Sequence, residues 1–138
     1  MTREVLHQSM SFQLDAGSGV PAYLQLAEQV KQALRMGLLG VGDQLPTVKQ
    51  VVAEVAVNPN TVLKAYRELE RDGLVEGRPG LGTFVLRVPS GPPPSVHAGL
   101  ARRLSVWVRS AREAGLDDEA ILGLMQDALG AADEAGVA

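Results

Sequence analysis

The sequence contains no cysteine, so it can form neither a disulfide framework nor a thiolate metal site. It has only two histidines, His7 and His97, and neither has a carboxylate or a second histidine at ligand spacing. Asp117, Asp118 and Glu119 lie together, but helix starts favour acidic side chains without any metal. The sequence therefore predicts no metal, no cofactor and no enzymatic activity.

Long apolar runs are also absent. No window approaches the roughly 20 consecutive apolar residues that cross a membrane. The N-terminus, MTREVLHQSMSF, lacks the apolar run of a secretory signal. Aromatic residues make up only 4% of the 138 residues, whereas aliphatic residues are ample, which favours one globular helical core over disorder. We expect a soluble cytoplasmic protein without a membrane partner.

Charge of neither sign dominates, because the formal net charge is only −3. Residues 45–90 have a net charge of +1, residues 91–138 of −3 and residues 1–44 of −1. This distribution permits a nucleic-acid partner, but it predicts weak non-specific binding.

The stretch NPNTVLKAYRELERDG, from Asn58 to Gly73, predicts a short amphipathic helix with clear ends. Asn58 is a favoured N-cap residue, and Pro59 suits the first helical position because an N–H there has no helical partner. Val57 and Val62 are spaced for a hydrophobic staple. Gly73 supplies the C-terminal stop.

The two faces of this helix differ in chemistry. The apolar face has the i, i+3, i+4, i+7 spacing and comprises Val62, Ala65, Tyr66 and Leu69. The opposite face carries only hydrogen-bond donors and cations, namely Asn60, Lys64, Arg67 and Arg71. Such a face suits a groove of double-stranded DNA, although an ordinary solvated helix surface is the alternative reading of this stretch alone.

The segments before this helix predict the rest of a helix-turn-helix. Met10 to Leu14 alternates apolar and polar residues as a short strand does, and residues 22–36 predict a helix that ends at Gly37. Thr47 is placed to cap the next helix. That helix carries valine at helical spacing, at Val48, Val51, Val52 and Val55. A tight Ala-Val turn without glycine then leads into the Asn58 cap.

After Gly73 the pattern changes to period two, which predicts two strands joined by a turn at RPGLG. Gly80 and Gly82 allow positive φ and a close approach of the backbone. A hairpin directly after a helix-turn-helix predicts a winged helix. A hairpin that only closes the small core with Phe84 and Leu86 is the alternative.

The C-terminal part reads as a separate helical region. Residues 89–95, PSGPPPS, predict a semi-rigid linker of polyproline character. It follows a winged helix-turn-helix domain of residues 10–88 and precedes two helices within residues 96–138. The predicted fold class is mainly α with a small β-hairpin, completed by a two-helix dimerisation tail.

The two tail helices carry apolar stripes that they cannot bury alone. We predict a homodimer through this region with Trp107 as an anchor, and packing on the winged helix of the same chain is the alternative. The predicted dimerisation residues are Leu100, Leu104, Trp107, Val108, Ile121, Leu124 and Met125. Because roughly forty residues of two helices cannot enclose an ordinary ligand cavity, a small-molecule effector stays unassigned.

Residues 21–85 resemble the DNA-binding domain of the GntR family of transcription regulators. The matching run begins at PAYLQ, continues through GDQLPTVK and ends with the Asn58 helix and GLGTFV. The wording VNPNTV, AY and ELE is most similar to the YtrA branch, whose C-terminal region is also short and two-helical. The resemblance implies a dimeric regulator, usually a repressor, at an inverted-repeat operator, often beside ABC transporter genes.

The resemblance also implies DNA contacts where the residues match. The matching positions in the helix and the wing are Asn58, Asn60, Thr61, Lys64, Gly80, Gly82 and Thr83. Three positions depart from the family pattern: Lys49 replaces a usual arginine, Val52 a common alanine and Leu81 an often basic residue. Lysine can hold a phosphate but lacks the bidentate fork of arginine. We expect the three departures to alter operator sequence and affinity, but not DNA binding itself.

Docking of a winged helix places the N-terminal residues of the second helix nearest the bases. We expect Asn60 to pair with adenine, Lys64 with guanine, and Thr61 to meet a thymine methyl or a phosphate. Asn58 stays open between a contact and a cap alone. The predicted set is completed by Thr47 and by four cations that suit phosphate, Lys49, Arg67, Arg71 and Arg78. The rival function is a winged helix that binds protein and never touches DNA.

Overall fold

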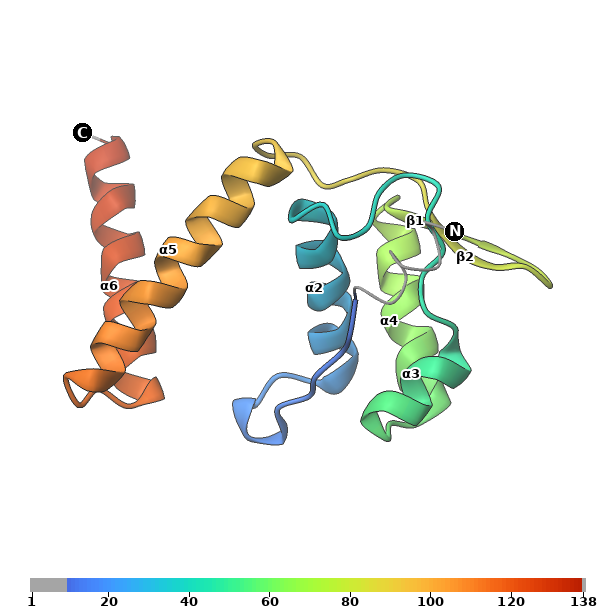
Figure 1. Cartoon of the computed structure of the whole chain (residues 1–138), viewed down its shortest axis with the longest axis horizontal. Coiled ribbons are helices and arrows are strands. Elements are labelled where there is room, and N and C mark those ends of the chain that lie inside the picture. Colours follow the sequence, from blue (N-terminus) through green and yellow to red (C-terminus); the bar gives the residue numbers. More distant parts are fainter. Residues whose placement is uncertain (1–9, 138) are drawn as a thin grey trace. The chain divides into compact units, whose positions relative to one another are not determined.

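The computed structural model describes the backbone of residues 10–137 and the side chains of residues 10–132. The chain divides into two compact units, residues 1–98 and 99–138. The first contains a short 3-10 helix, η1 (Ala16–Ser18), three α-helices, α2, α3 and α4, and a hairpin of β1 and β2 (Figure 1). The second contains most of α5 and all of α6. These five α-helices and one antiparallel hairpin confirm the predicted fold class.

The core of the first unit lies where α2 (Ala22–Arg35) packs against α4 (Pro59–Arg71). Each helix buries one apolar stripe, as the helical spacing predicts. The fully buried side chains of the two helices include Leu26, Val30, Leu34, Val62 and Leu69. The helix α2 ends where predicted, because Gly37 follows it with a φ of 78°.

The helix-turn-helix is formed by α3 (Val48–Val55) and α4. Thr47 caps α3 in a reciprocal capping box, in which its side chain accepts from the Gln50 N–H and the Gln50 side chain accepts from the Thr47 N–H. The turn has no glycine, and Ala56 takes the left-handed conformation with a φ of 52°. A non-glycine residue is strained there, so packing of α3 on α4 must hold the turn.

The wing is an antiparallel pair, β1 (Val75–Arg78) and β2 (Gly82–Val85), with Val75 opposite Val85. This register points Val75 and Val85 into the core, both at least 98% buried. The alternative in which Phe84 and Leu86 close the core is therefore wrong: Leu86 is 44% exposed. The period of two was correct, but its phase was shifted by one residue.

The predicted strand at Met10 to Leu14 is also wrong, because this segment forms no strand and belongs to no sheet. Side chains of the helices satisfy its backbone instead. Glu54 of α3 accepts from the Phe12 N–H at 2.8 Å, and the Gln29 amide both accepts from the Gln13 N–H and donates to its carbonyl. The alternation still marks burial, since Met10 and Phe12 are both buried.

The second unit contains α6 (Asp118–Val137) and the greater part of α5 (Pro94–Glu113). The predicted linker of residues 89–95 overlaps the start of α5, because Pro94 already suits a first helical position. Asp117 caps α6 by accepting from the Ala120 N–H at 2.9 Å. Among its described side chains only Ala111 and Ile121 are buried, so this unit has almost no core of its own.

Candidate nucleic-acid interface

The front of α4 presents polar groups to solvent. Asn58 caps the helix, because its side-chain oxygen accepts from the Asn60 N–H at 2.8 Å, and this leaves the Asn58 side-chain NH2 group as a donor. The side chain of Asn60 is exposed and makes no hydrogen bond within the described residues. Thr61 beside it is half-buried. Asn60 is therefore the most available base-reading group at this end of α4.

Lys64 has a partner within the protein. Its ammonium lies 4.1 Å from the centroid of the Tyr23 ring on α2. Such a cation–π contact contributes about 0.5–1 kcal/mol at an exposed site. The contact holds the charge on the side of α4 that faces α2, so a reach to guanine would require Lys64 to leave the ring. Tyr23 was assigned no role from the sequence, because the contact joins helices that are distant along the chain.

The two arginines farther along α4 differ in their surroundings. Arg67 is exposed and forms no ion pair with any described residue. Arg71 is paired with Glu68 at 3.0 Å, although its own side chain is 73% exposed. An exposed pair of this kind is weak, at about 0–1 kcal/mol, so Arg71 can exchange Glu68 for a phosphate at little cost.

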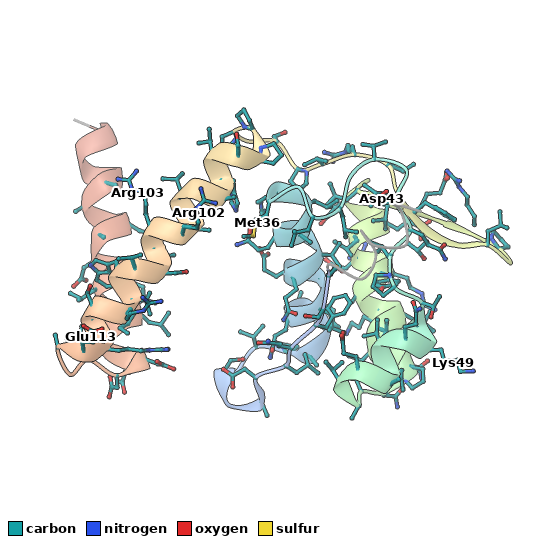
Figure 2. The ribbon with its side chains drawn as sticks, in the orientation of Figure 1. Met36, Asp43, Lys49, Arg102, Arg103 and Glu113 are labelled. Atoms are coloured by element: carbon teal, nitrogen blue, oxygen red, sulfur yellow. The ribbon has the colours of Figure 1, made fainter. Side chains whose placement is uncertain are left out.

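Thr47 precedes α3 as its N-cap and Lys49 lies in its first turn, and both are exposed. Lys49 extends from α3 into solvent (Figure 2). The Tyr66 hydroxyl donates to the Pro46 carbonyl at 2.6 Å, which fixes the start of α3 against α4. Burial raises the pKa of the Tyr66 hydroxyl, and the Glu54 carboxylate raises it further, so this donor keeps its proton. The predicted placement of Tyr66 in the core is confirmed.

The wing and α4 line an open groove of about 630 Å³, to which Thr47 before α3 also contributes. Its lining residues are Thr47, Glu70, Gly77, Arg78, Pro79, Gly80, Leu81, Gly82 and Thr83. The predicted wing positions thus line one surface. Gly80 and Gly82 have φ values of 76° and 130°, as their type allows. The Arg78 guanidinium lies 4.6 Å from the Phe84 ring centroid and pairs with Glu76 at 2.8 Å.

Two further residues of this region carried no prediction. Glu70 lines the groove, and Gln44 contacts the wing from the loop before α3. Glu70 lies in the run ELE and Gln44 in the run GDQLPTVK, and both runs carry the resemblance to the family. The sequence could have marked them as part of the motif, but their contacts depend on how the hairpin folds back.

The predicted dimerisation residues lie in the helical tail. Leu100, Leu104 and Trp107 are 53%, 50% and 40% exposed, and Leu124 is 47% exposed. Val108 and Met125 are half-buried. Ile121 is only 5% exposed within one chain, and it is therefore less available to a partner than predicted.

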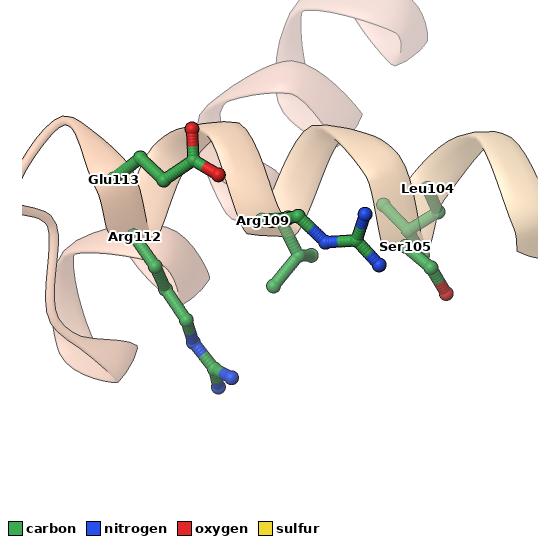
Figure 3. A pocket seen from close by; sticks show the side chains of 6 residues that line it. Leu104, Ser105, Arg109, Arg112 and Glu113 are labelled. Atoms are coloured by element: carbon green, nitrogen blue, oxygen red, sulfur yellow. The ribbon is translucent and has the colours of Figure 1, made fainter.

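One face of α5 forms a shallow groove of about 640 Å³ (Figure 3). It is lined by Leu104, Ser105, Val108, Arg109, Arg112 and Glu113. Leu104 and Val108 supply its apolar lining. The Arg109 side chain runs along α5 toward Ser105, and Arg112 projects away from the helix (Figure 3). Arg112 also pairs with Asp118 at 2.9 Å.

In the part of the chain that the structure describes, no helix is long and apolar enough to span a membrane. Among the described side chains of residues 10–132, no three His, Asp or Glu are grouped as metal ligands would be.

A helix-turn-helix with a polar second helix and a glycine wing defines the class of winged-helix DNA-binding proteins.

Comparison with known proteins gives the family. Residues 22–85 match the model for bacterial regulatory proteins of the gntR family. The chain is 38% identical over 103 residues to the HTH-type transcriptional regulator Rv1152 of Mycobacterium tuberculosis, which covers 75% of this chain and 81% of that protein. The protein belongs to the GntR family of DNA-binding transcription regulators.

The predicted branch is confirmed as well. The chain is 42% identical over 73 residues to the HTH-type transcriptional repressor YtrA of Bacillus subtilis, which covers 53% of this chain and 56% of YtrA. The chain thus matches little more than half the length of that relative. The crystal structure of a transcriptional antiterminator from Listeria monocytogenes EGD-e has a TM-score of 0.54 at 28% identity and covers 85% of this chain and 88% of that one. Since the relatives are regulators, the prediction that the chain is not an enzyme is confirmed.

Proposed function

We propose that this regulator is a dimeric repressor that binds an inverted-repeat operator through α4 and the wing. In this proposal Asn60 and Thr61 read bases, and Lys49, Arg67, Arg71 and Arg78 hold phosphates. Lys64 reads a base only after leaving Tyr23, and Asn58 acts mainly as a cap. The resemblance to YtrA, which is named a repressor, supports the direction of regulation. By the same resemblance, the regulated genes form a small operon such as one for an ABC transporter.

One observation carries the proposal: the α4 stripe of Asn60, Lys64, Arg67 and Arg71 carries only donors and cations, and the neighbouring acid, Glu68, is paired with Arg71. An ordinary solvated helix face mixes both signs of charge, whereas a face that enters a DNA groove meets phosphates on both sides. The free side chains of Asn60 and Arg67 lie on this stripe.

The proposed dimer follows from the tail. The second unit buries almost nothing of its own, and its exposed leucines and Trp107 lie on α5 and α6. The helix α5 carries four arginines and one glutamate, whereas α6 carries five acidic residues and no lysine or arginine. These opposite charges favour a second copy in which α5 of one chain lies near α6 of its partner.

A band-shift assay with charge-reversed variants tests the α4 contact. Lys64→Glu with Arg67→Glu should abolish binding to a palindromic duplex selected from a random-sequence pool, because four units of charge change in the groove. The matched control is Lys31→Glu with Arg35→Glu, which makes the same change of charge on α2, outside both the α4 stripe and the helical tail.

The control pair should retain DNA binding, and urea denaturation checks that both variants are folded. Survival of tight binding in the Lys64/Arg67 variant would show that α4 does not enter the groove. Absence of binding by the unmodified chain would favour a winged helix that binds protein.

A further inference from the structure

The base of the wing is attached to the first unit by backbone hydrogen bonds. The Gly42 N–H donates to the Val85 carbonyl at 2.9 Å, and the Leu45 N–H donates to the Thr83 carbonyl at 2.8 Å. These bonds hold Thr83 to Val85 of β2, and residues 77–82 form the outer half of the wing. A two-stranded hairpin alone is only marginally stable, so the outer half needs other support.

The Gln44 side chain supports the outer half from one side. Its Nε2 donates to the Leu81 carbonyl at 3.2 Å, at the tip of the wing. Gly82 makes this approach possible, because a Cβ at that position would collide with the Gln44 amide. Gly82 therefore serves the contact with Gln44 as well as its own left-handed φ of 130°.

The Glu70 side chain supports the outer half from α4. Its Oε2 accepts from the Gly77 N–H at 3.3 Å. A Cβ built on Gly77 would lie 3.9 Å from both carboxylate oxygens, so the carboxylate lies directly over this backbone. The hydrogen bond joins the helix proposed to read the bases to the first strand of the wing.

The charge of Glu70 argues against a direct phosphate contact. The carboxylate lines the groove between α4 and the wing, where it would repel the DNA backbone. A carboxylate in this groove lowers the electrostatic affinity for DNA, so we do not assign Glu70 to DNA binding. Its hydrogen bond to the Gly77 N–H gives it a structural role instead.

We propose that Gln44 and Glu70 are positioning residues that fix the wing tip relative to α4, so that both elements contact the same duplex. The inference rests on the proposed contact of the wing with DNA. Loss of either brace leaves the base of the wing attached but lets residues 77–82 move. In the unmodified protein the wing tip is already ordered before DNA binds. Without a brace, DNA binding must itself order residues 77–82, and this entropy cost weakens the affinity.

Two substitutions at Glu70 separate its hydrogen bond from its charge. Glu70→Gln removes the charge but keeps an acceptor for Gly77, whereas Glu70→Ala removes both. Binding to the selected palindromic duplex is measured by fluorescence anisotropy across a salt series. Glu70→Gln should bind as tightly as the unmodified protein or more tightly, and Glu70→Ala should bind about fivefold more weakly than Glu70→Gln. Gln44→Ala should lose about fivefold relative to the unmodified protein.

Amide hydrogen exchange in the absence of DNA supplies the second readout. The Gly77 amide should exchange faster in Glu70→Ala than in Glu70→Gln, while the urea midpoints of the two variants stay equal. Equal DNA affinities for the two variants, or equal exchange at Gly77, would overturn the inference. If the unmodified protein binds no duplex, the proposed function fails instead, and the exchange result still reports whether Glu70 braces the wing.

Discussion

At the scale of single residues, the Tyr66 hydroxyl does more for the fold than its place on an apolar stripe indicates. It joins α4 to the Pro46 carbonyl, one residue before the Thr47 cap of α3. The apolar pattern predicted the ring in the core. It could not predict the acceptor, which lies 20 residues away along the chain.

Tyr66→Phe should lower the free energy of unfolding by about 1 kcal/mol, because the Pro46 carbonyl loses its donor while the ring stays packed. Urea denaturation measures the change. Tyr23→Phe is the matched control: it removes a hydroxyl for which the described structure shows no hydrogen bond, and it keeps the ring under Lys64. Equal losses in the two variants would contradict the role of the Tyr66 bond.

The raised pKa of Tyr66 also predicts a pH dependence. In the unfolded chain the hydroxyl ionises near its ordinary value of 10, whereas the folded protein holds it neutral at higher pH. Above pH 10 the unfolded state therefore gains stability, and the free energy of unfolding falls by up to about 1.4 kcal/mol per pH unit from this group. Denaturation between pH 9 and 11, compared with Tyr66→Phe, should show this slope only in the protein that retains Tyr66.

At the scale of elements, the ends of the helices were the most predictable features. Thr47 and Asn58 both cap the helices that they precede, because their side chains reach only two or three residues ahead. The predictions were wrong where a feature depends on residues that are distant along the chain. The segment at Met10 has side chains of α2 and α3 in place of a strand partner, and the phase of β2 depends on its register with β1.

The helix-turn-helix turn offers a test of local strain. Ala56→Gly should raise the free energy of unfolding by about 0.5–1 kcal/mol, because glycine adopts a φ of 52° without the steric cost that alanine bears. Thermal or urea denaturation measures it.

The control for this test is Ala53→Gly, the same change at an exposed position inside α3. It should lower stability by about 1 kcal/mol through helix propensity. A loss of stability at Ala56 as well would show that the turn is not strained.

At the scale of the whole molecule, the sequence predicted a DNA-binding unit and a helical tail, and each could be recognised from its own pattern. The α4 surface followed from helical spacing alone. The sequence did not predict that Lys64 rests on Tyr23, that Gln44 and Glu70 hold the wing, or that Ile121 is buried within one chain. Each of these depends on two segments that meet only in the fold.

The tail provides the prediction at this scale. Leu104→Asp should weaken self-association by about tenfold or more, because it places a charge on the proposed apolar seam. Sedimentation velocity measures the association. Val106→Asp is the matched control, since Val106 is 60% exposed on the same helix but lies off the stripe of Leu100, Leu104 and Val108. Equal effects of the two changes would place the interface elsewhere.

Selection of bound duplexes from a random-sequence pool tests the central claim, which is that two copies of α4 read one operator. The enriched sequences should form an inverted repeat whose half-site centres are separated by about one helical turn, roughly 10 base pairs, or a multiple of it. The selection should enrich no inverted repeat when Asn60 and Arg67 are both replaced by alanine. Enrichment of a single asymmetric site, or of no sequence at all, would contradict the account.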